Sequence, residues 1–343
     1  AYNDGQPVLM IDNEVTFGVP GTYIFPEVPR DLIARPTLSW MLAANTSARR
    51  ELEAIYLTNG MTWRADYVLV LGAEESLAGL SGWVTLDNRS GATFRNARLK
   101  LVAGDVNRVR EDLGRKGYPV AAKAAAMAEV VPQFKESELF EYHLYALERP
   151  TDVKNNQSKQ VGLLAAEDVP VKKEYVFYGA DNYYRSQRTG DIARNQKVPV
   201  FLIFRNDKAS RLGMPLPKGI VRVYKRDKDD ALQFIGENTI DHTPKDESVR
   251  LLLGNAFDVV GDRKQTSWTV ISGNTYEAAY EISLRNHKKE GVTIRVVEPI
   301  PGDWRILDTT HAYVKEDSGT AAFSVKVDPD REVKLGYRVR IRF

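Results

Sequence analysis

The last eleven residues, "VKLGYRVRIRF" (333–343), decide the fold class because apolar and polar side chains alternate along them. The apolar positions are Val333, Leu335, Tyr337, Val339, Ile341 and Phe343. A period of two is typical of a strand with one face on a hydrophobic core and the other in water. The same rhythm recurs at 276–285, 293–297 and 323–327, so the sequence predicts half-buried β-strands.

Other apolar runs are almost continuous, which is typical of central strands covered on both faces. These runs are 66–71, 199–204, 220–224 and 249–253. Turn sequences at 87–91, 285–291 and 328–332 separate strand-like segments at hairpin spacing. Parallel sheets would need many crossover helices. The sequence therefore predicts an all-β protein of antiparallel, immunoglobulin-like β-sandwich domains.

One segment contrasts with this pattern. "PVAAKAAAMAEVV" (119–131) is rich in alanine, the best helix former, so we expect a helix there. It lies in a charged, alanine-rich stretch, about 110–160, which we interpret as a helical insertion into the β framework. A chain of 343 residues exceeds one ordinary core. We expect a domain at 1–196 that carries the insertion, a β-sandwich at 197–265 and a second sandwich at 266–343.

Two stretches of the chain resemble each other. "NGMTWRADYVLVL" (59–71) and "PGDWRILDTT" (301–310) both place a Trp-Arg pair after a turn. A common sandwich plan could produce both features, so they are weak evidence of duplication.

Composition and charge exclude several classes of function. Lys plus Arg total 48 and Asp plus Glu total 46, so the net charge of +2 gives no global attraction to nucleic acid, and we expect no such partner. The absence of cysteine excludes disulfides, thiolate nucleophiles and cysteine–zinc sites. The longest apolar run, 198–204, is shorter than the roughly 20 residues that span a bilayer, so we expect no membrane span. The chain begins at Ala1 rather than at methionine, which favours removal of a signal peptide.

No motif indicates a reaction centre. The four histidines are far apart and form no HExxH pair. Acidic clusters at 227–230, 315–319 and 328–330 lack the spacing of a calcium loop, although calcium binding there stays open. We expect no catalytic residue, no metal site and no cofactor, and we expect that the protein is not an enzyme. The paired carboxylates of a glycosidase can come from remote strands, so a hydrolase remains an alternative.

Two adjacent tyrosines are candidates for a contact surface. Tyr183 and Tyr184 lie in a polar, turn-rich stretch, where exposed rings could stack on a sugar or on another subunit. The alternative is that both rings fold over a sheet edge, since tyrosine is commonly half-buried.

The polar face of the last strand is the second candidate. It carries Lys334, Arg338, Arg340 and Arg342. Arginine suits carboxylate and phosphate groups, so the row could bind or assemble with a partner. Alternatively, it is the solvated face of a half-buried strand, with cross-strand partners among Glu277, Glu281 and Glu298.

Long stretches of the chain resemble one family. "YLTNGMTWRADYVLVL" (56–71) followed by "LSGWVTLDNRSGATFRNARLKLVAGDVNRV" (80–109) is similar to the DUF4139, or mucoidy-inhibitor-like, family. The blocks at 280–307 and 313–343 look like the same family's ending. The resemblance implies a protein of unknown function, often bacterial and often secreted, and it supplies no catalytic residues. The N-terminal stretch has no heptads, unlike the coiled coil that precedes this region in many members.

The leading hypothesis is a non-catalytic protein that is secreted, periplasmic or on the cell surface and acts through its surfaces. It would be structural or adhesive and able to self-assemble into polymers. Its partner would be another copy or an envelope protein, because a terminal strand can complete a neighbour's sheet. The alternatives are a carbohydrate-binding module with a glycan partner and the hydrolase with remote carboxylates.

Overall fold

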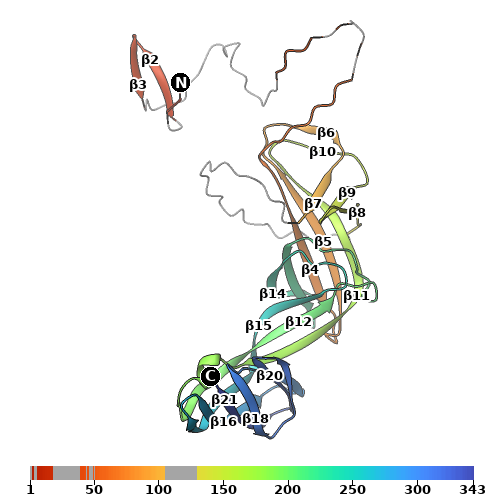
Figure 1. Ribbon diagram of the computed structural model, residues 1–343. Coiled ribbons are helices and arrows are strands. Elements are labelled where there is room, and N and C mark those ends of the chain that lie inside the picture. Colours follow the sequence, from red (N-terminus) through yellow and green to blue (C-terminus); the bar gives the residue numbers. More distant parts are fainter. Residues whose placement is uncertain are drawn as a thin grey trace. The chain divides into compact units, whose positions relative to one another are not determined.

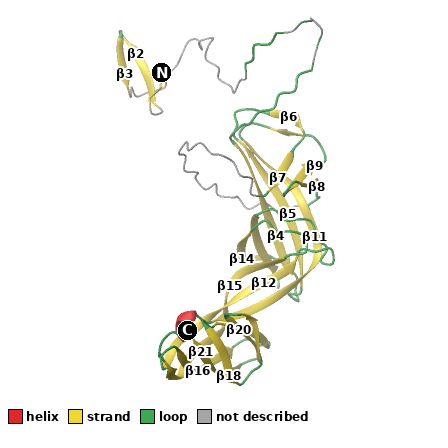
Figure 2. Ribbon diagram, in the orientation of Figure 1, coloured by secondary structure: helices red, strands yellow, loops and turns green. Residues whose placement is uncertain are grey.

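The computed structural model describes residues 2–3, 6–17, 39–43, 45, 49, 51–104 and 130–343. The chain divides into two compact units, Ala1–Leu57 and Thr58–Phe343. Among the described residues strand dominates, and helical structure is limited to the short 3-10 helix η1 (Asp181–Tyr184), drawn red in Figure 2. The prediction of an all-β protein is confirmed. In this described part, no helix is long and apolar enough to cross a membrane.

The first unit contains a small antiparallel sheet of three strands. These are β1 (Tyr2–Asn3), β2 (Gln6–Ile11) and β3 (Glu14–Phe17). Asp12 and Asn13 join β2 to β3 with φ of 50° and 69°. Two positive φ values are typical of the tight hairpin turns that favour Asn and Asp.

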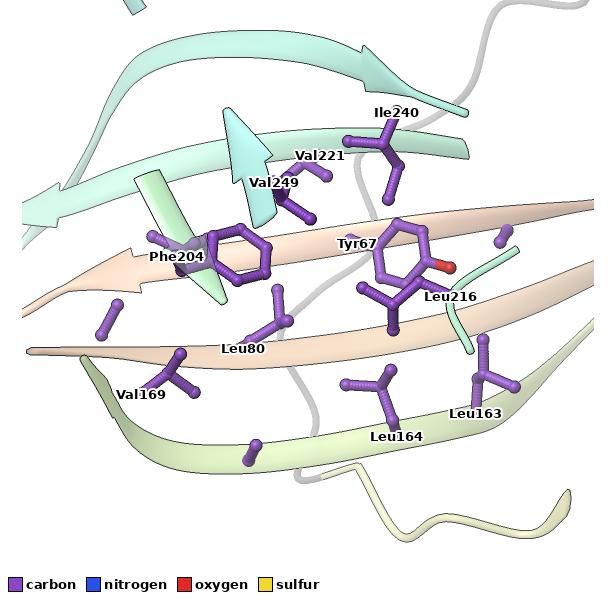
Figure 3. Packing of buried hydrophobic residues seen from close by; sticks show 14 of the residues in the cluster. Tyr67, Leu80, Leu163, Leu164, Val169, Phe204, Leu216, Val221, Ile240 and Val249 are labelled. Atoms are coloured by element: carbon purple, nitrogen blue, oxygen red, sulfur yellow. The ribbon is translucent and has the colours of Figure 1, made fainter. Parts of the chain in front are cut away.

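In the second unit, seven strands surround the first hydrophobic core. Their order in the sheet is β14-β13-β4-β5-β11-β12-β15. They are β4 (Met61–Leu71), β5 (Leu77–Asn88), β11 (Gln157–Tyr178), β12 (Gly190–Arg205), β13 (Gly219–Arg226), β14 (Leu232–Ile240) and β15 (Ser248–Ser272). The two ends of this order approach each other, since a Cβ on Gly236 of β14 would lie 2.8 Å from the carbonyl oxygen of Leu253 on β15. Tyr67, Leu80 and Phe204 point into the space between the strands (Figure 3).

The described part of the stretch predicted to be a helical insertion forms two small sheets together with residues 94–103, which precede it. One has the order β7-β9-β8, and the other pairs β6 with β10. The strands are β6 (Phe94–Ala97), β7 (Lys100–Ala103), β8 (Phe134–Leu139), β9 (Tyr142–Leu147) and β10 (Thr151–Val153). Residues 130–160 are therefore not helical, because Phe134 and Tyr145 join the first core and the Tyr145 hydroxyl donates to the Pro215 carbonyl at 2.7 Å. Residues 119–129 of the expected alanine-rich helix lie outside the described residues.

The second core lies between two layers of strands. Five further strands and the C-terminal strand complete them: β16 (Thr275–Asn286), β17 (Val292–Pro299), β18 (Asp303–Thr309), β19 (Tyr313–Asp317), β20 (Thr320–Val327) and β21 (Arg331–Arg342). One layer has the order β15-β16-β21-β18, and the other has β11-β17-β20-β19. The rings of Phe323 and Tyr337, one from each layer, lie 5.4 Å apart.

The C-terminal strand β21 is a central strand. Val339 pairs with Ala278 of β16 on one side and with Ile306 of β18 on the other. The sequence-based idea that this strand completes a neighbour's sheet is therefore wrong for residues 337–342, whose backbone is paired on both sides.

Two buried asparagines reveal an internal repeat. The Asn88 amide donates to the carbonyls of Ala92, Val153 and Lys154, and the Asn286 amide donates to those of Glu290, Val327 and Asp328. The order β4-β5-β11 around Asn88 matches β15-β16-β21 around Asn286, and the pair β6–β10 matches β17–β20. The repeat thus aligns 61–88 with 259–286, rather than the Trp-Arg stretches that resemble each other in the sequence.

Three strands pass without a break from the first core into the second (Figure 1). Each buries side chains in both cores: Val169 and Phe177 on β11, Leu202 and Val198 on β12, and Leu251 and Val259 on β15. The expected domain boundaries at 196/197 and 265/266 both fall inside strands, β12 and β15. The division into three domains stays a prediction.

A cluster of charges links the turns of the two cores. Glu75, in the turn between β4 and β5, accepts hydrogen bonds from Lys173 and Lys225. Lys173 also lies 3.9 Å from Glu290 in the turn between β16 and β17. Burial opposes ionisation of Glu75, but its bonds from the two lysines prevail and lower its pKa to about 2.

Glu75→Gln is expected to lower the free energy of unfolding near neutral pH by about 1–2 kcal/mol, allowing for partial exposure of the carboxylate. Because the folded pKa lies below the unfolded value of 4.5, this stabilisation is present above 4.5 and is lost as the pH falls towards about 2. Urea unfolding should show the gap between variant and wild type narrowing at about pH 3. Glu148→Gln, the same change at an exposed position, is the control. An equal difference in the free energy of unfolding between variant and wild type at neutral pH and at about pH 3 would contradict the lowered pKa of Glu75.

Candidate functional site

The cationic row predicted on β21 lies on the exposed face of that strand. Arg340 donates to Glu277 on β16, with 2.9 Å between Nε and Oε1. Lys334 donates to Glu281 on the same strand at 3.2 Å. The structure therefore confirms two of the three predicted acidic partners.

The other two arginines face acidic residues by register. Arg338 lies opposite Asp308 on β18, and Arg342 lies opposite Asp303. Each cation of the row thus has an acidic residue beside it on a neighbouring strand. This arrangement favours a charge-balanced solvated face over a site for a phosphate or carboxylate ligand.

The third predicted partner of the row, Glu298, does not lie on this face. It is fully buried on β17, where the inward positions Val292, Ile294 and Val296 lead up to it. Its carboxylate binds both terminal nitrogens of Arg263 on β15, at 2.6 and 2.7 Å. The prediction that Glu298 pairs with the arginine row is wrong, because alternation along β17 directs this side chain into the second core.

The tyrosine pair forms part of η1 and does not form an exposed platform. Tyr184 is fully buried, and its hydroxyl contacts Glu298 Oε2 and lies 2.7 Å from the hydroxyl of Tyr337. Tyr183 is half-buried, with its ring centroid 5.2 Å from the Arg263 guanidinium. The structure thus favours folded-over rings, and it places the tyrosines and the arginine row on opposite faces of β21.

These contacts define a buried network of five side chains: Arg263, Glu298, Tyr184, Tyr337 and Tyr280. It joins both layers of the second core, since Arg263, Tyr280 and Tyr337 come from one layer and Glu298 from the other. The Arg263 guanidinium carbon lies 5.3 Å from the ring centroid of Phe177 and 5.2 Å from that of Tyr183. A Cβ on Gly179 would approach Glu298 Oε2 to 2.4 Å, so glycine makes room for the carboxylate.

The electrostatics of the network fix its protonation state. Burial alone would lower the pKa of Arg263, but the Glu298 carboxylate raises it above its ordinary value. Burial, followed by the charge of Glu298, raises the pKa of Tyr184 and Tyr337 well above 10. Burial also raises the pKa of Tyr280, to about 12. The tyrosines are therefore neutral hydrogen-bond donors at any physiological pH.

The network can orient the two layers, because it joins side chains from both. A bidentate arginine–carboxylate pair accepts few alternative geometries, so it specifies how β15 and β17 lie against each other. Across the part of the chain that the structure describes, no group of three or more His, Asp or Glu side chains is arranged to hold a metal ion.

The sequence did contain a signal for this network. Val259, Gly261, Arg263 and Gln265 follow one inward face of β15, and Glu298 ends the inward face of β17. A charged residue in an apolar register indicates a buried partner elsewhere, because an unpaired buried charge is very costly. The sequence alone does not say which acid and which base meet.

Comparison with family models gives no match for this chain. Comparison with curated proteins gives none either. The resemblance to the DUF4139 family stays a prediction.

Proposed function

We propose that this protein is a non-catalytic structural or adhesive protein that acts through its surfaces and associates with its own copies. The observation that carries the proposal is the passage of β11, β12 and β15 through both hydrophobic cores. Tension between the two cores of the second unit would be borne by continuous backbone and by sheet hydrogen bonds instead of by a linker. The charge cluster around Glu75 and the buried Arg263–Glu298 pair support the same role, since the cluster links turns of the two cores and the pair joins the two layers of the second core.

The finer architecture and the setting belong to the same proposal. We propose that the second core is an immunoglobulin-like sandwich, which its two facing layers support. Membership of the DUF4139 family, and a location outside the cytoplasm, rest on the sequence resemblance at 56–109 and 280–343.

The manner of association follows from the place of β21. Because residues 337–342 are paired on both sides, this segment is not free to enter another copy's sheet. The outer strands β18 and β19 carry charged residues such as Arg305, Lys315 and Glu316, which discourage edge-to-edge pairing. Association would therefore use side-chain surfaces.

Electron microscopy of native material, together with light scattering of the purified protein, tests the proposal. We expect the mean mass in solution to rise with protein concentration and native material to show ordered assemblies. A mass that stays at one chain up to about 1 mM would refute self-association.

A further inference from the structure

The hairpin tip between β8 and β9 holds an apolar residue in an unfavourable conformation. Leu139 pairs with Tyr142, so Phe140 and Glu141 form a two-residue turn. Phe140 has a φ of 56°, and of the twelve non-glycine residues with positive φ in the described chain it alone is apolar. Glycine is favoured at such a position, and a bulky residue there is strained.

The same residue is also poorly covered. The Phe140 side chain is 88% exposed, and Leu139 beside it is 45% exposed. Exposed acids, Glu138 and Glu141, flank the pair. Backbone strain combined with an exposed ring is a cost to the folded chain, and such costs cluster at contact sites.

An apolar groove on the same molecule has complementary chemistry. Phe134, Leu163, Leu212 and Met214 line it, and its volume is about 180 Å³. An apolar cavity of roughly 150 Å³ is large enough for a benzene ring. Arg211 also lines the groove; its guanidinium is exposed, pairs with the equally exposed Asp168 at 2.8 Å, and is opposite in charge to the acids of the tip.

The groove is held in shape without a ligand. The buried Asn206 amide donates to the carbonyls of Met214 and Pro244 at 2.9 and 3.0 Å, and Asn206 Oδ1 accepts from Gly213 N. These hydrogen bonds fix the loop around Gly213 and Met214, which forms one wall of the groove.

The tip cannot fill the groove of its own chain. Phe134 lies at the groove and begins β8, whereas Phe140 follows the last residue of that strand, a separation of about 20 Å at roughly 3.3 Å per residue. One rigid strand keeps the two apart, so the groove that Phe140 reaches must belong to another molecule.

We propose that Phe140 and Leu139 of one copy insert into this groove of a second copy, with Glu138 and Glu141 near Arg211. The proposal deepens the self-association proposed above and rests on it. Each copy carries one tip and one groove, so the contact can repeat from copy to copy. The contact is small, which makes it weak as a single interaction.

Sedimentation velocity from about 10 µM to about 1 mM tests the contact with three variants of the whole chain. Phe140→Gly removes the ring and the strain. Ala165→Arg places a long side chain on an exposed residue that lines the groove. Phe257→Ala removes a ring that is 95% exposed elsewhere and serves as the matched control.

We expect the wild type and Phe257→Ala to associate equally, and each of the other two variants to stay monomeric. An equimolar mixture of Phe140→Gly and Ala165→Arg should form dimers that grow no further, because one variant keeps a groove and the other keeps a tip. The thermal midpoint of Phe140→Gly should equal or exceed that of the wild type, which separates lost contact from lost folding.

The outcomes distinguish the two proposals. If the wild type associates and Phe140→Gly associates equally well, the tip–groove contact is wrong and self-association stands. If the wild type stays monomeric throughout, both proposals fail.

Discussion

Replacing Glu298 with alanine is expected to lower the free energy of unfolding by about 3–5 kcal/mol. The change would leave the Arg263 guanidinium fully buried without its carboxylate. It would also leave the hydroxyls of Tyr184 and Tyr337 without the oxygen that they share. Whole proteins are stable by only about 5–15 kcal/mol, so the second core would be close to unfolding. Urea denaturation followed by tryptophan fluorescence measures the loss.

Replacing both Arg263 and Glu298 distinguishes the cost of leaving one charge buried without a partner from the cost of losing the contact between the two side chains. Arg263→Met with Glu298→Leu is expected to cost less than either single change, because no charge is then left unpaired. Arg340→Ala, which breaks an ion pair on the exposed face of β21, should cost less than about 1 kcal/mol. A double variant that is less stable than both single variants would show that the layers depend on the pair itself.

Removing residues 333–343 is expected to unfold the second core and not merely to prevent assembly. The truncation would delete four buried side chains: Leu335, Tyr337, Val339 and Ile341. It would also separate β16 from β18, because β21 lies between them. The loss of several buried large side chains, each contributing about 2–5 kcal/mol, exceeds the stability of an ordinary domain.

Limited proteolysis with mass mapping is the measurement for this truncation. Cleavage is expected within 275–327 in the truncated chain, and the wild type should resist under the same conditions. Removing Phe343 alone is the control, since this residue is 45% exposed, follows the end of β21 and forms its hydrogen bonds with Asn274 in the turn before β16. A truncated chain that remains resistant throughout 275–327 would contradict the central role of β21.

The alternation of apolar and polar residues was sufficient to predict the strands, because each strand buries one face against a hydrophobic core. The runs at 66–71, 199–204, 220–224 and 249–253 all form strands, as predicted, but the run at 249–253 is not covered on both faces, since Leu252 is 41% exposed. Pairing between strands that are distant in the sequence could not be predicted, because hydrogen bonds between such strands leave no local trace in the sequence. The parallel pairing of β11 with β17 is an example, since it joins 175–178 to 294–297.

The candidate site was predictable only in part. The partners of Arg340 and Lys334 follow from antiparallel neighbours with opposite charge. Glu298 was misassigned, and Tyr184 was left open between an exposed and a folded-over ring, because a polar atom in a side chain does not show which face of the sheet it occupies. The burial of Glu298 and Tyr184 can be explained only from the structure. Arg263 balances the charge of Glu298, and the Tyr184 hydroxyl donates to the same carboxylate.

The repeat centred on Asn88 and Asn286 has a consequence for how the chain avoids misfolding. Because the two repeats share one strand register, a strand of one repeat can pair wrongly within the other, which is a typical misfolding route of repeat proteins. Val259 pairs with Asn286, and Arg263 follows it by four residues. Met61 pairs with Asn88, and the residue at the same distance after it is the small, buried Ala65. If the two repeats of one chain exchanged this strand, Arg263 would be buried without its carboxylate, which is very costly. The Arg263–Glu298 pair therefore favours correct pairing of each repeat with its own strands.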